Sequence, residues 1–496
     1  MGRRIIPSIQ KKPASLSIRN TPNDFSPGTT FHSIVERIHV SLRQVFVPGV
    51  VACVLLAGCS TGRHETSGQD LLGPVPDVVT ADIQEGIEKH IEEQMLLGNG
   101  FFKIHFGGKE LQLKLVRVHT EYLANLGPRR HFACVDLASS EGDVYDVDFF
   151  LVGDPGAMTV TETTVHKTNG QPLYLWKQKR DRTWRRAPVK AASPRQLGII
   201  EERDEFEFLY RATLPEITDT ARMWIPMPAT DAFQKVTIKA IEAPVDQEIL
   251  EDDEHGNKVL FLTLDPEDSG KTIAIRYGVE RLEKGVYVDE SRPPDKYLRP
   301  ERLVPDNENF RAIAEEVVEG KQGELVRARA LYDHTIDRMR YMKFGSGYGQ
   351  GDAVYACDSR TGNCTDFHSY FIALSRSVGI PARFAIGASI PSERDAGGIS
   401  GYHCWAEFYT DGRWWPIDIS EGDKCSRLST YFFGHHPANR IELSRGRDIV
   451  VSPGPASGPI NFHAYPVLEV GEKLAKTKVE FSFNRRDWAG EPPAEF

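Results

Sequence analysis

Apolar residues recur at three- and four-residue steps after Gly362, which is the pattern of one helical face. The residues on this face are Phe367, Tyr370, Phe371, Leu374 and Val378. Asn363 or Thr361 can cap the start of the helix, and Gly379 followed by Pro381 marks its end. The pattern therefore predicts an amphipathic helix that begins shortly after Gly362.

Strand patterns follow this helix. Residues 384–390 alternate as in a half-buried strand, and residues 403–409 are again extended. The run Thr-Asp-Gly-Arg at 410–413 is a hairpin turn signal, so residues 414–419 are expected to return as the partner strand of 403–409. The segment thus predicts a helix followed by a small antiparallel sheet.

A cysteine, a histidine and an aspartate fall at chemically useful positions of these elements. Cys364 lies on the first turn of the predicted helix, where the helix dipole and the free backbone N–H groups favour the thiolate. His403 and Asp418 lie on the two neighbouring strands. A histidine near a thiol can accept its proton, and a carboxylate behind the imidazole fixes the tautomer and stabilises the imidazolium. The three residues therefore predict a Cys-His-Asp catalytic triad.

The sequence around these residues resembles the transglutaminase-like superfamily, whose core is a papain-like cysteine-enzyme fold. The resemblance rests on G-N-C-T-D-F at 362–367, G-Y-H-C-W-A-E-F-Y at 401–409 and W-W-P-I-D at 414–418, within residues 327–423. It implies that Cys364 is the nucleophile and His403 the proton carrier, and that Asp418 orients the histidine. The family includes protein crosslinkers, peptide and amide hydrolases, deglycosylating amidases and non-catalytic relatives, so the resemblance leaves the substrate open.

A Gly-rich loop between Arg340 and Asn363 directly precedes Cys364 and contains a candidate oxyanion donor. The backbone N–H of Cys364 can donate one hydrogen bond to a developing oxyanion. Gln350 is the candidate for a second donor, by analogy with the upstream glutamine of papain-like enzymes. A Gly-rich loop near a site would also hold Gln350 as an ordinary loop residue, and both interpretations stay open.

The chain has 496 residues, which favours about three domains at ~150 residues each, and the predicted fold class is α+β. A small α+β domain is expected at 79–190, by analogy cystatin-like. Its helix is expected at 81–97, and an antiparallel meander is expected at 102–106, 110–120, 131–137, 144–152 and 158–167.

Residues 195–290 predict an all-β, immunoglobulin-like sandwich. Its strands are expected at 205–212, 222–226, 235–242, 258–264 and 272–282. The papain-like catalytic domain is expected at 306–484, with amphipathic helices at 309–318 and 324–339 at its start. Strands at 461–470 and 479–484 are expected to close it, and residues 485–496 form a tail.

Residues 1–59 are expected to be a disordered extension followed by a lipoprotein signal peptide. Basic residues precede an apolar run at 45–57, which is shorter than the ~20 residues of a membrane-spanning helix. The run ends in L-A-G-C-S and resembles a bacterial lipobox, which implies that Cys59 is acylated and becomes the mature N-terminus. An ordinary buried segment or an uncleaved anchor is the alternative. A polar linker at 60–78 follows.

No metal or other cofactor is predicted. The histidines of the first domain stand at irregular spacings, without a cysteine or carboxylate at a ligand spacing: His105, His119, His131 and His166. A zinc site in the catalytic domain is the rival to the triad, but it lacks a C-x-x-C pair: Cys357, Cys364, His403 and Cys404. The sequence leaves open a disulfide among Cys357, Cys404 and Cys425.

These observations predict an exported, membrane-tethered cysteine enzyme that acts on amide bonds through a thioester, as a peptidase or amidase. The expected substrate is a protein, a peptide or a cell-wall-type amide, and the expected membrane contact is the lipid anchor. A formal net charge of −10 gives no support to nucleic-acid binding. Two alternatives stay open, a protein-crosslinking transglutaminase and a non-catalytic binding or scaffold protein with this fold.

Overall fold

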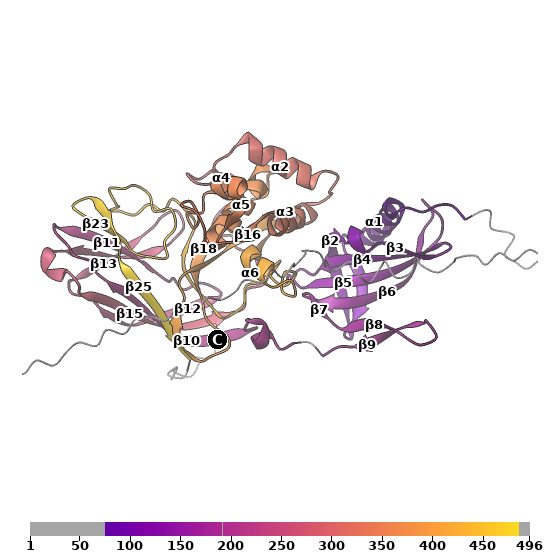
Figure 1. Cartoon of the computed structure of the whole chain (residues 1–496), viewed down its shortest axis with the longest axis horizontal. Helices are drawn as coiled ribbons and strands as arrows, with labels where there is room; N and C mark the ends of the chain where they lie inside the picture. The colour runs from indigo at the N-terminus through magenta and orange to yellow at the C-terminus, as the bar shows by residue number, and fades with distance from the viewer. Residues whose placement is uncertain (1–74, 191, 486–496) are drawn as a thin grey trace, which may run out of the picture. The chain divides into compact units, whose positions relative to one another are not determined.

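The computed structural model describes residues 75–190 and 192–485 (Figure 1). The signal peptide with Cys59, the linker up to residue 74 and the tail from residue 486 lie outside the described residues. Within the described ranges, no helix combines the length and the apolar character needed to cross a membrane.

The first part of the described chain is one helix packed on an antiparallel sheet. The helix α1 (Thr80–Leu97) buries Ile83, Ile87 and Ile91, which stand one turn apart and face the sheet. The sheet order is β1-β2-β4-β5-β6-β7, and β3 also pairs with β4. The strands are β1 (Phe102–Phe106), β2 (Lys109–Val118), β3 (Ala124–Gly127), β4 (Arg130–Ala138), β5 (Val144–Val152), β6 (Thr159–Thr168) and β7 (Gln171–Pro172). A separate hairpin of β8 (Tyr174–Gln178) and β9 (Trp184–Pro188) follows.

Two five-stranded antiparallel sheets come next and share one apolar core. The first has the order β12-β15-β10-β25-β19 and the second β13-β14-β11-β23-β24. The bounds are β10 (Arg203–Thr213), β11 (Ala221–Met227), β12 (Gln234–Glu242), β13 (Gln247–Glu251), β14 (Lys258–Leu264) and β15 (Thr272–Leu282), then β19 (Ala396–Ile399), β23 (Val467–Val470), β24 (Lys473–Ala475) and β25 (Lys478–Asn484). The five predicted strands of this region are confirmed, and β13 was not predicted.

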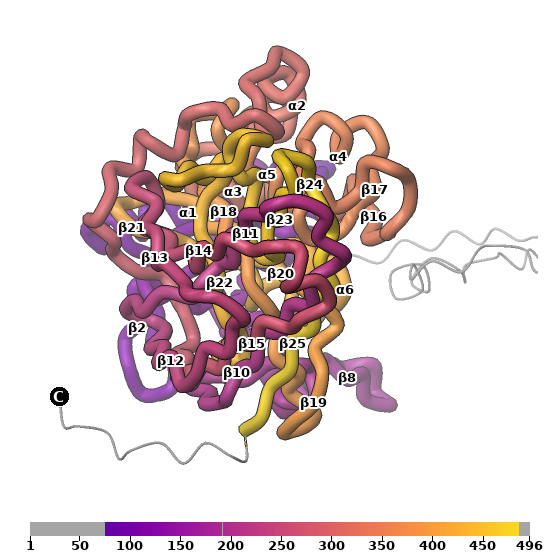
Figure 2. The backbone as a smooth tube through the Cα atoms, turned by 90° about the vertical axis from the view of Figure 1, so that its left-hand side faces the viewer, coloured from indigo at the N-terminus to yellow at the C-terminus, as the bar shows by residue number. Residues whose placement is uncertain are grey.

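The sequence led us to expect that the C-terminal strands close the catalytic domain. The structure shows that they do not. In Figures 1 and 2 the yellow strand β25 runs among the magenta strands, and it pairs with β10 and β19. The physical reason is burial, because Phe481 packs against Phe208 and Tyr210 with ring centroids 5.4 and 5.0 Å apart. Strand β19 forms the edge beside β25.

The remaining elements surround a central helix, α5 (Cys364–Ser377). One side of α5 contacts β18 and β20 of a four-stranded antiparallel sheet with the order β21-β20-β18-β22, and other helices contact its other side. The helices are α2 (Glu308–Val318), α3 (Glu324–Arg338), α4 (Ala353–Ser359) and α6 (Ile419–Lys424); the strands are β18 (Ala382–Ser389), β20 (His403–Thr410), β21 (Arg413–Ile417) and β22 (Arg440–Arg445), with a short parallel pair β16 (Arg340–Tyr341) and β17 (Thr361–Gly362). Residues 364–375 are all buried, so α5 is the core of this region rather than an amphipathic surface helix.

Candidate active site

The start of α5 positions Cys364 and is held by two side chains. The side-chain oxygen of Asn363 accepts the N–H of Thr365 at 3.0 Å and caps the helix. The Asp366 carboxylate accepts the N–H of Asn363 at 2.9 Å and that of Gly349 at 2.7 Å, which ties the helix start to the preceding loop. Cys364 therefore lies at the positive end of a 14-residue helix, as predicted.

His403 and Asp418 meet through the hairpin of β20 and β21. His403 opens β20, and Asp418 directly follows β21, its antiparallel neighbour. Nε2 of His403 lies 2.6 Å from Oδ2 of Asp418. This leaves Nδ1 as the ring nitrogen that can exchange a proton with Cys364. The hairpin thus joins the predicted histidine and aspartate, although Asp418 caps α6 instead of ending a strand.

Asp418 is buried and fully ionised. Its Oδ1 accepts the N–H of Glu421 and the hydroxyl of Ser420, both at 3.0 Å. Its Oδ2 accepts from the guanidinium of Arg440 at 2.6 Å. Burial alone would raise the pKa of Asp418, but the positive charges of His403 and Arg440 hold it well below its ordinary value. The carboxylate behind His403 therefore keeps its negative charge across the physiological pH range.

His368 links the helix start to the aspartate segment. Its Nδ1 donates to the carbonyl oxygen of Cys364 at 2.7 Å, and its Nε2 accepts the N–H of Ile419 at 3.1 Å. The ring is completely buried, and burial lowers its pKa. A neutral imidazole with its proton on Nδ1 satisfies both hydrogen bonds. Neutral His368 therefore connects the backbone of Cys364 to that of Ile419, the residue after Asp418.

The charges at the site favour a thiolate and an imidazolium. Burial alone would raise the pKa of Cys364, but hydrogen bonding to Cys404 and His403 and the positive charge of His403 hold it well below its ordinary value. Burial lowers the pKa of His403, but the charge and the hydrogen bond of Asp418, with a further contribution from Cys364, raise it to about 9. The proton of the pair therefore resides on His403 at neutral pH.

Cys404 is a second thiol within this site. Its Sγ lies 3.6 Å from Nδ1 of His368. Because α5 packs against β20, the same side chain reaches Cys364. Burial and the neighbouring Cys364 raise the pKa of Cys404 well above its ordinary value. Cys404 therefore stays protonated and serves as a hydrogen-bond donor rather than as a second nucleophile.

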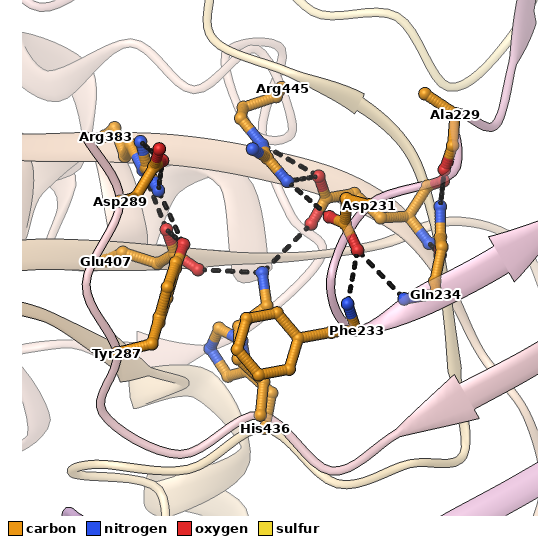
Figure 3. A network of polar contacts seen from close by, with 12 residues as sticks. Ala229, Asp231, Phe233, Gln234, Tyr287, Asp289, Arg383, Glu407, His436 and Arg445 are labelled. Atoms are coloured by element: carbon orange, nitrogen blue, oxygen red, sulfur yellow. Dashed lines mark hydrogen bonds and ion pairs between the residues drawn. The ribbon is translucent and has the colours of Figure 1, made fainter. Parts of the chain in front are cut away.

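Strand β20 is held in place by a buried network around Glu407 (Figure 3). Nζ of Lys284 lies 3.0 Å from Oε1 of Glu407, and Nε of Arg383 lies 2.7 Å from its Oε2. The hydroxyl of Tyr287 donates to Oε2 at 2.8 Å. Burial alone would raise the pKa of Glu407, but Lys284 and Arg383 hold it well below its ordinary value. The strand that carries His403 is therefore fixed by charge pairs to the segment that follows β15.

Gln350, the candidate oxyanion donor, is an exposed residue of the loop before α4. Its backbone oxygen accepts from Asn461 at 2.8 Å and from Arg447 at 3.5 Å. These contacts hold the backbone of the loop, and the role of the Gln350 amide stays a prediction. The amide of Asn363, which adjoins Cys364, donates to the Tyr402 hydroxyl at 2.9 Å.

The sequence analysis did not identify the residues that contact Cys364 and Asp418 from neighbouring elements. His368 was visible only as a polar residue one turn after Cys364, although that spacing places both on one face of a helix. Arg440 carried no local signal, because only the packing of β22 beside β18 brings it to Asp418. Cys404 was recognised as a neighbour of His403, but its contact with Cys364 was not predicted.

The structure shows the state of the cysteines in the described residues. The five described cysteines, Cys134, Cys357, Cys364, Cys404 and Cys425, are free. Within residues 75–190 and 192–485, the groups of side chains with metal-ligand geometry lie in the first domain and do not include Cys364 or His403.

Comparison with known proteins supports the assignment of this region. Residues 311–419 match the profile of the transglutaminase-like superfamily. The chain is also 24% identical over 315 residues to an uncharacterized protein of Haemophilus influenzae, a match that covers 54% of this chain and 85% of the relative.

Two solved structures are similar over a comparable share of the chain. A candidate cysteine protease from Cytophaga hutchinsonii matches with a TM-score of 0.40 and 17% identity, over 56% of this chain and 91% of that chain. A candidate protease from Parabacteroides distasonis matches with a TM-score of 0.21 and 11% identity, over 58% of this chain and 63% of that chain. From the profile match, the chain contains, at residues 311–419, a domain of the transglutaminase-like superfamily.

Proposed function

We propose that this protein is a cysteine enzyme that cleaves amide bonds, with Cys364 as nucleophile, His403 as proton carrier and Asp418 as the residue that orients His403. The observation that carries the proposal is the charge arrangement at the start of α5. A thiol whose pKa lies well below its ordinary value adjoins a histidine whose pKa is about 9, and that histidine lies 2.6 Å from a buried carboxylate. Such a pair is needed for attack by a thiolate at neutral pH.

The reaction follows from these protonation states. The Cys364 thiolate attacks the carbonyl carbon of the amide, and the backbone N–H of Cys364 stabilises the oxyanion. The amine leaves with the proton of the His403 imidazolium, and a thioester remains on Cys364. Neutral His403 then takes a proton from water, the hydroxide attacks the thioester, and the thiolate and imidazolium form again. Asp418 stays ionised throughout and stabilises the imidazolium.

The cellular setting is proposed from the sequence alone. The apolar run at 45–57 and the lipobox at Cys59 support export and attachment through a lipid anchor, although this segment lies outside the described residues. An exported enzyme meets water, proteins, peptides and cell-wall-type amides. We therefore place hydrolysis of such amides before transfer of the acyl group to an amine.

Peptide and amide substrates in ¹⁸O-labelled water, with and without an added primary amine, test the proposal. The parent should release a carboxylate that contains ¹⁸O, while Cys364→Ala should not turn over. Cys357→Ala is the matched control, since Cys357 is a buried cysteine of α4 outside the triad. An amine-linked product in place of the labelled acid would establish acyl transfer. Equal turnover by the parent and Cys364→Ala would reject the proposed enzyme.

A further inference from the structure

The sheet of the first domain carries buried acidic side chains on the face opposite α1. Alternation along β4 and β5 directs apolar residues such as Val135 and Val147 into the core beneath α1. The intervening positions of β5 are Asp146 and Asp148, which are 4% and 1% exposed. Buried carboxylates need partners, because an unpaired buried charge costs several kcal/mol. The contacts of these two side chains therefore decide what this face can bind.

His166 of β6 directs a free nitrogen at both carboxylates. Its Nε2 lies 3.1 Å from the carbonyl oxygen of Tyr174, so this nitrogen carries the proton that it donates. Nδ1 of the neutral ring is then an unprotonated acceptor. It lies 3.7 Å from Oδ1 of Asp146 and 3.6 Å from Oδ1 of Asp148. Three side-chain atoms that can donate electron pairs thus face one another.

The two carboxylates differ in how their charge is compensated. Asp146 is paired with the ammonium of Lys167 through Oδ2, and its Oδ1 accepts the thiol of Cys134 at 2.9 Å. Among the described residues, no lysine or arginine forms an ion pair with Asp148, whose Oδ2 accepts from the Tyr174 hydroxyl at 2.9 Å and from the Trp176 indole at 3.4 Å. Its Oδ1 is buried and without a hydrogen-bond partner. This oxygen faces Nδ1 of His166.

We propose that Asp146, Asp148 and His166 form a binding site for a divalent transition-metal ion, with Zn²⁺ as the best fit. Ligand bonds of 2.0–2.2 Å in tetrahedral geometry separate neighbouring donor atoms by about 3.4 Å. The observed separations of 3.6 and 3.7 Å are close to this value, and the three donor atoms lie within 4.8 Å of one another. The ion would supply the positive charge that Asp148 lacks.

The donor set distinguishes among ions. One imidazole nitrogen and two carboxylate oxygens suit Zn²⁺ and related transition ions. Ca²⁺ requires six to eight oxygen ligands, and Mg²⁺ requires near-octahedral oxygen coordination, which these three side chains do not supply. The hydrogen bond from Nε2 to the Tyr174 carbonyl is the outer contact that fixes a metal-binding histidine in one tautomer. A fourth ligand, such as water, can enter beside His166, the most exposed of the three side chains.

A protonated His166 between the two carboxylates is the rival explanation. An imidazolium N–H bonds a carboxylate well at about 2.7–3.2 Å. Separations of 3.6 and 3.7 Å are too long for that bond. The rival would therefore leave Oδ1 of Asp148 with an ion pair but without a hydrogen bond of normal length, whereas a bound ion would coordinate it.

Zinc binding by the full chain, prepared without a polyhistidine tag, tests the proposal. After equilibrium dialysis against buffered Zn²⁺, mass spectrometry should find one bound zinc ion per chain. Asp148→Asn and His166→Gln should each weaken binding by at least about tenfold. His105→Gln is the matched control, since His105 is an exposed histidine of the same sheet, and it should bind as the parent does. Circular dichroism identifies any variant that does not fold.

X-ray absorption at the zinc edge provides a readout on the parent that needs no substitution. The proposal predicts nitrogen and oxygen neighbours at about 2.0–2.2 Å and no sulfur neighbour. A sulfur neighbour at about 2.3 Å would assign the ion to cysteines and overturn the proposal. Absence of bound zinc in the parent, or unchanged binding in both folded variants, would overturn it as well. None of these readouts depends on the activity proposed for Cys364.

Discussion

Nε2 of His403 lies 2.6 Å from Oδ2 of Asp418, an oxygen that Arg440 also bonds at 2.6 Å. The carboxylate is thus shared between an imidazole and a guanidinium, both buried. Because Arg440 keeps Asp418 ionised, Asp418 can raise the pKa of His403 to about 9. The raised pKa of His403 is what allows it to hold a proton beside the Cys364 thiolate at neutral pH.

Asp418→Asn should lower turnover and shift its pH dependence. Activity that requires the His403 imidazolium is present below its pKa and is lost as the pH rises through about 9. Asn removes the negative charge that raises this pKa, so the alkaline limit of kcat/KM should move to lower pH. We expect turnover to fall by about 10²-fold. This is smaller than the ~10⁴-fold effect in a serine triad, because a thiol nucleophile depends less on the third residue of the triad.

Asp423→Asn is the control for the charge change, since Asp423 lies in α6 but outside the hydrogen bonds of the triad. It should keep both the rate and the alkaline limit of the parent. A pH profile measured for both variants on one reporter amide decides the role of Asp418. Parent rate and an unmoved alkaline limit in Asp418→Asn would make Asp418 a structural residue only.

Arg440→Leu should destabilise the protein by about 3 kcal/mol, because it leaves the buried Asp418 with one cation instead of two. A carboxylate with a lowered folded-state pKa contributes stability above its unfolded pKa and loses it as the pH falls through the folded value. The cost of the substitution should therefore be full at pH 7 and should shrink in acid. Urea unfolding of both proteins at pH 7 and at acidic pH measures this loss of stability.

Arg440→Lys separates the charge from the shape of the side chain. It keeps one positive charge near Asp418 but loses the planar guanidinium, so its free energy of unfolding should lie between those of the parent and Arg440→Leu. Equal stability of all three proteins at pH 7 would mean that Arg440 does not stabilise the triad carboxylate.

Local patterns were sufficient for the central part of the site. The helix after Asn363, the hairpin of β20 and β21, and the meeting of His403 with Asp418 follow from periodicity, capping and a turn signal within one stretch of chain. The predicted helices at 309–318 and 324–339 are also confirmed as α2 and α3. The catalytic roles of the three residues stay a prediction, because geometry alone does not measure a reaction.

Contacts between segments that are distant in the chain could not be predicted from the sequence. Arg440 reaches Asp418, and Glu407 is paired with Lys284, only because strands far apart in the chain lie side by side. The same reason explains why β25 joins the sheet of β10: its register with β10 depends on the whole core. Sheet pairing also brings His166 to Asp146 and Asp148, although their spacing in the chain gave no metal signal.

Cys59→Ala tests the proposed lipid anchor. The thioether to the lipid can form only at that thiol, so the variant should accumulate as an unprocessed precursor or as a soluble protein. Metabolic labelling with a fatty acid and membrane fractionation measure the outcome, with Cys53→Ala as the control inside the predicted signal. A processed Cys59→Ala protein in the membrane fraction would contradict lipidation at this residue.

The identity of the nucleophile is the central claim, and alkylation tests it most directly. Iodoacetamide at mildly acidic pH, followed by peptide mapping, should label Cys364 fast, because its pKa lies well below its ordinary value while that of Cys404 lies well above it. Labelling should be slower in His403→Ala, which lacks the cation that stabilises the thiolate. Cys357→Ala should keep a fast-reacting Cys364, whereas Cys404→Ala should slow its labelling because it removes a hydrogen bond that lowers the pKa of Cys364. Cys364→Ala should lose activity. Preferential labelling of Cys404, together with activity that survives in Cys364→Ala, would contradict the account.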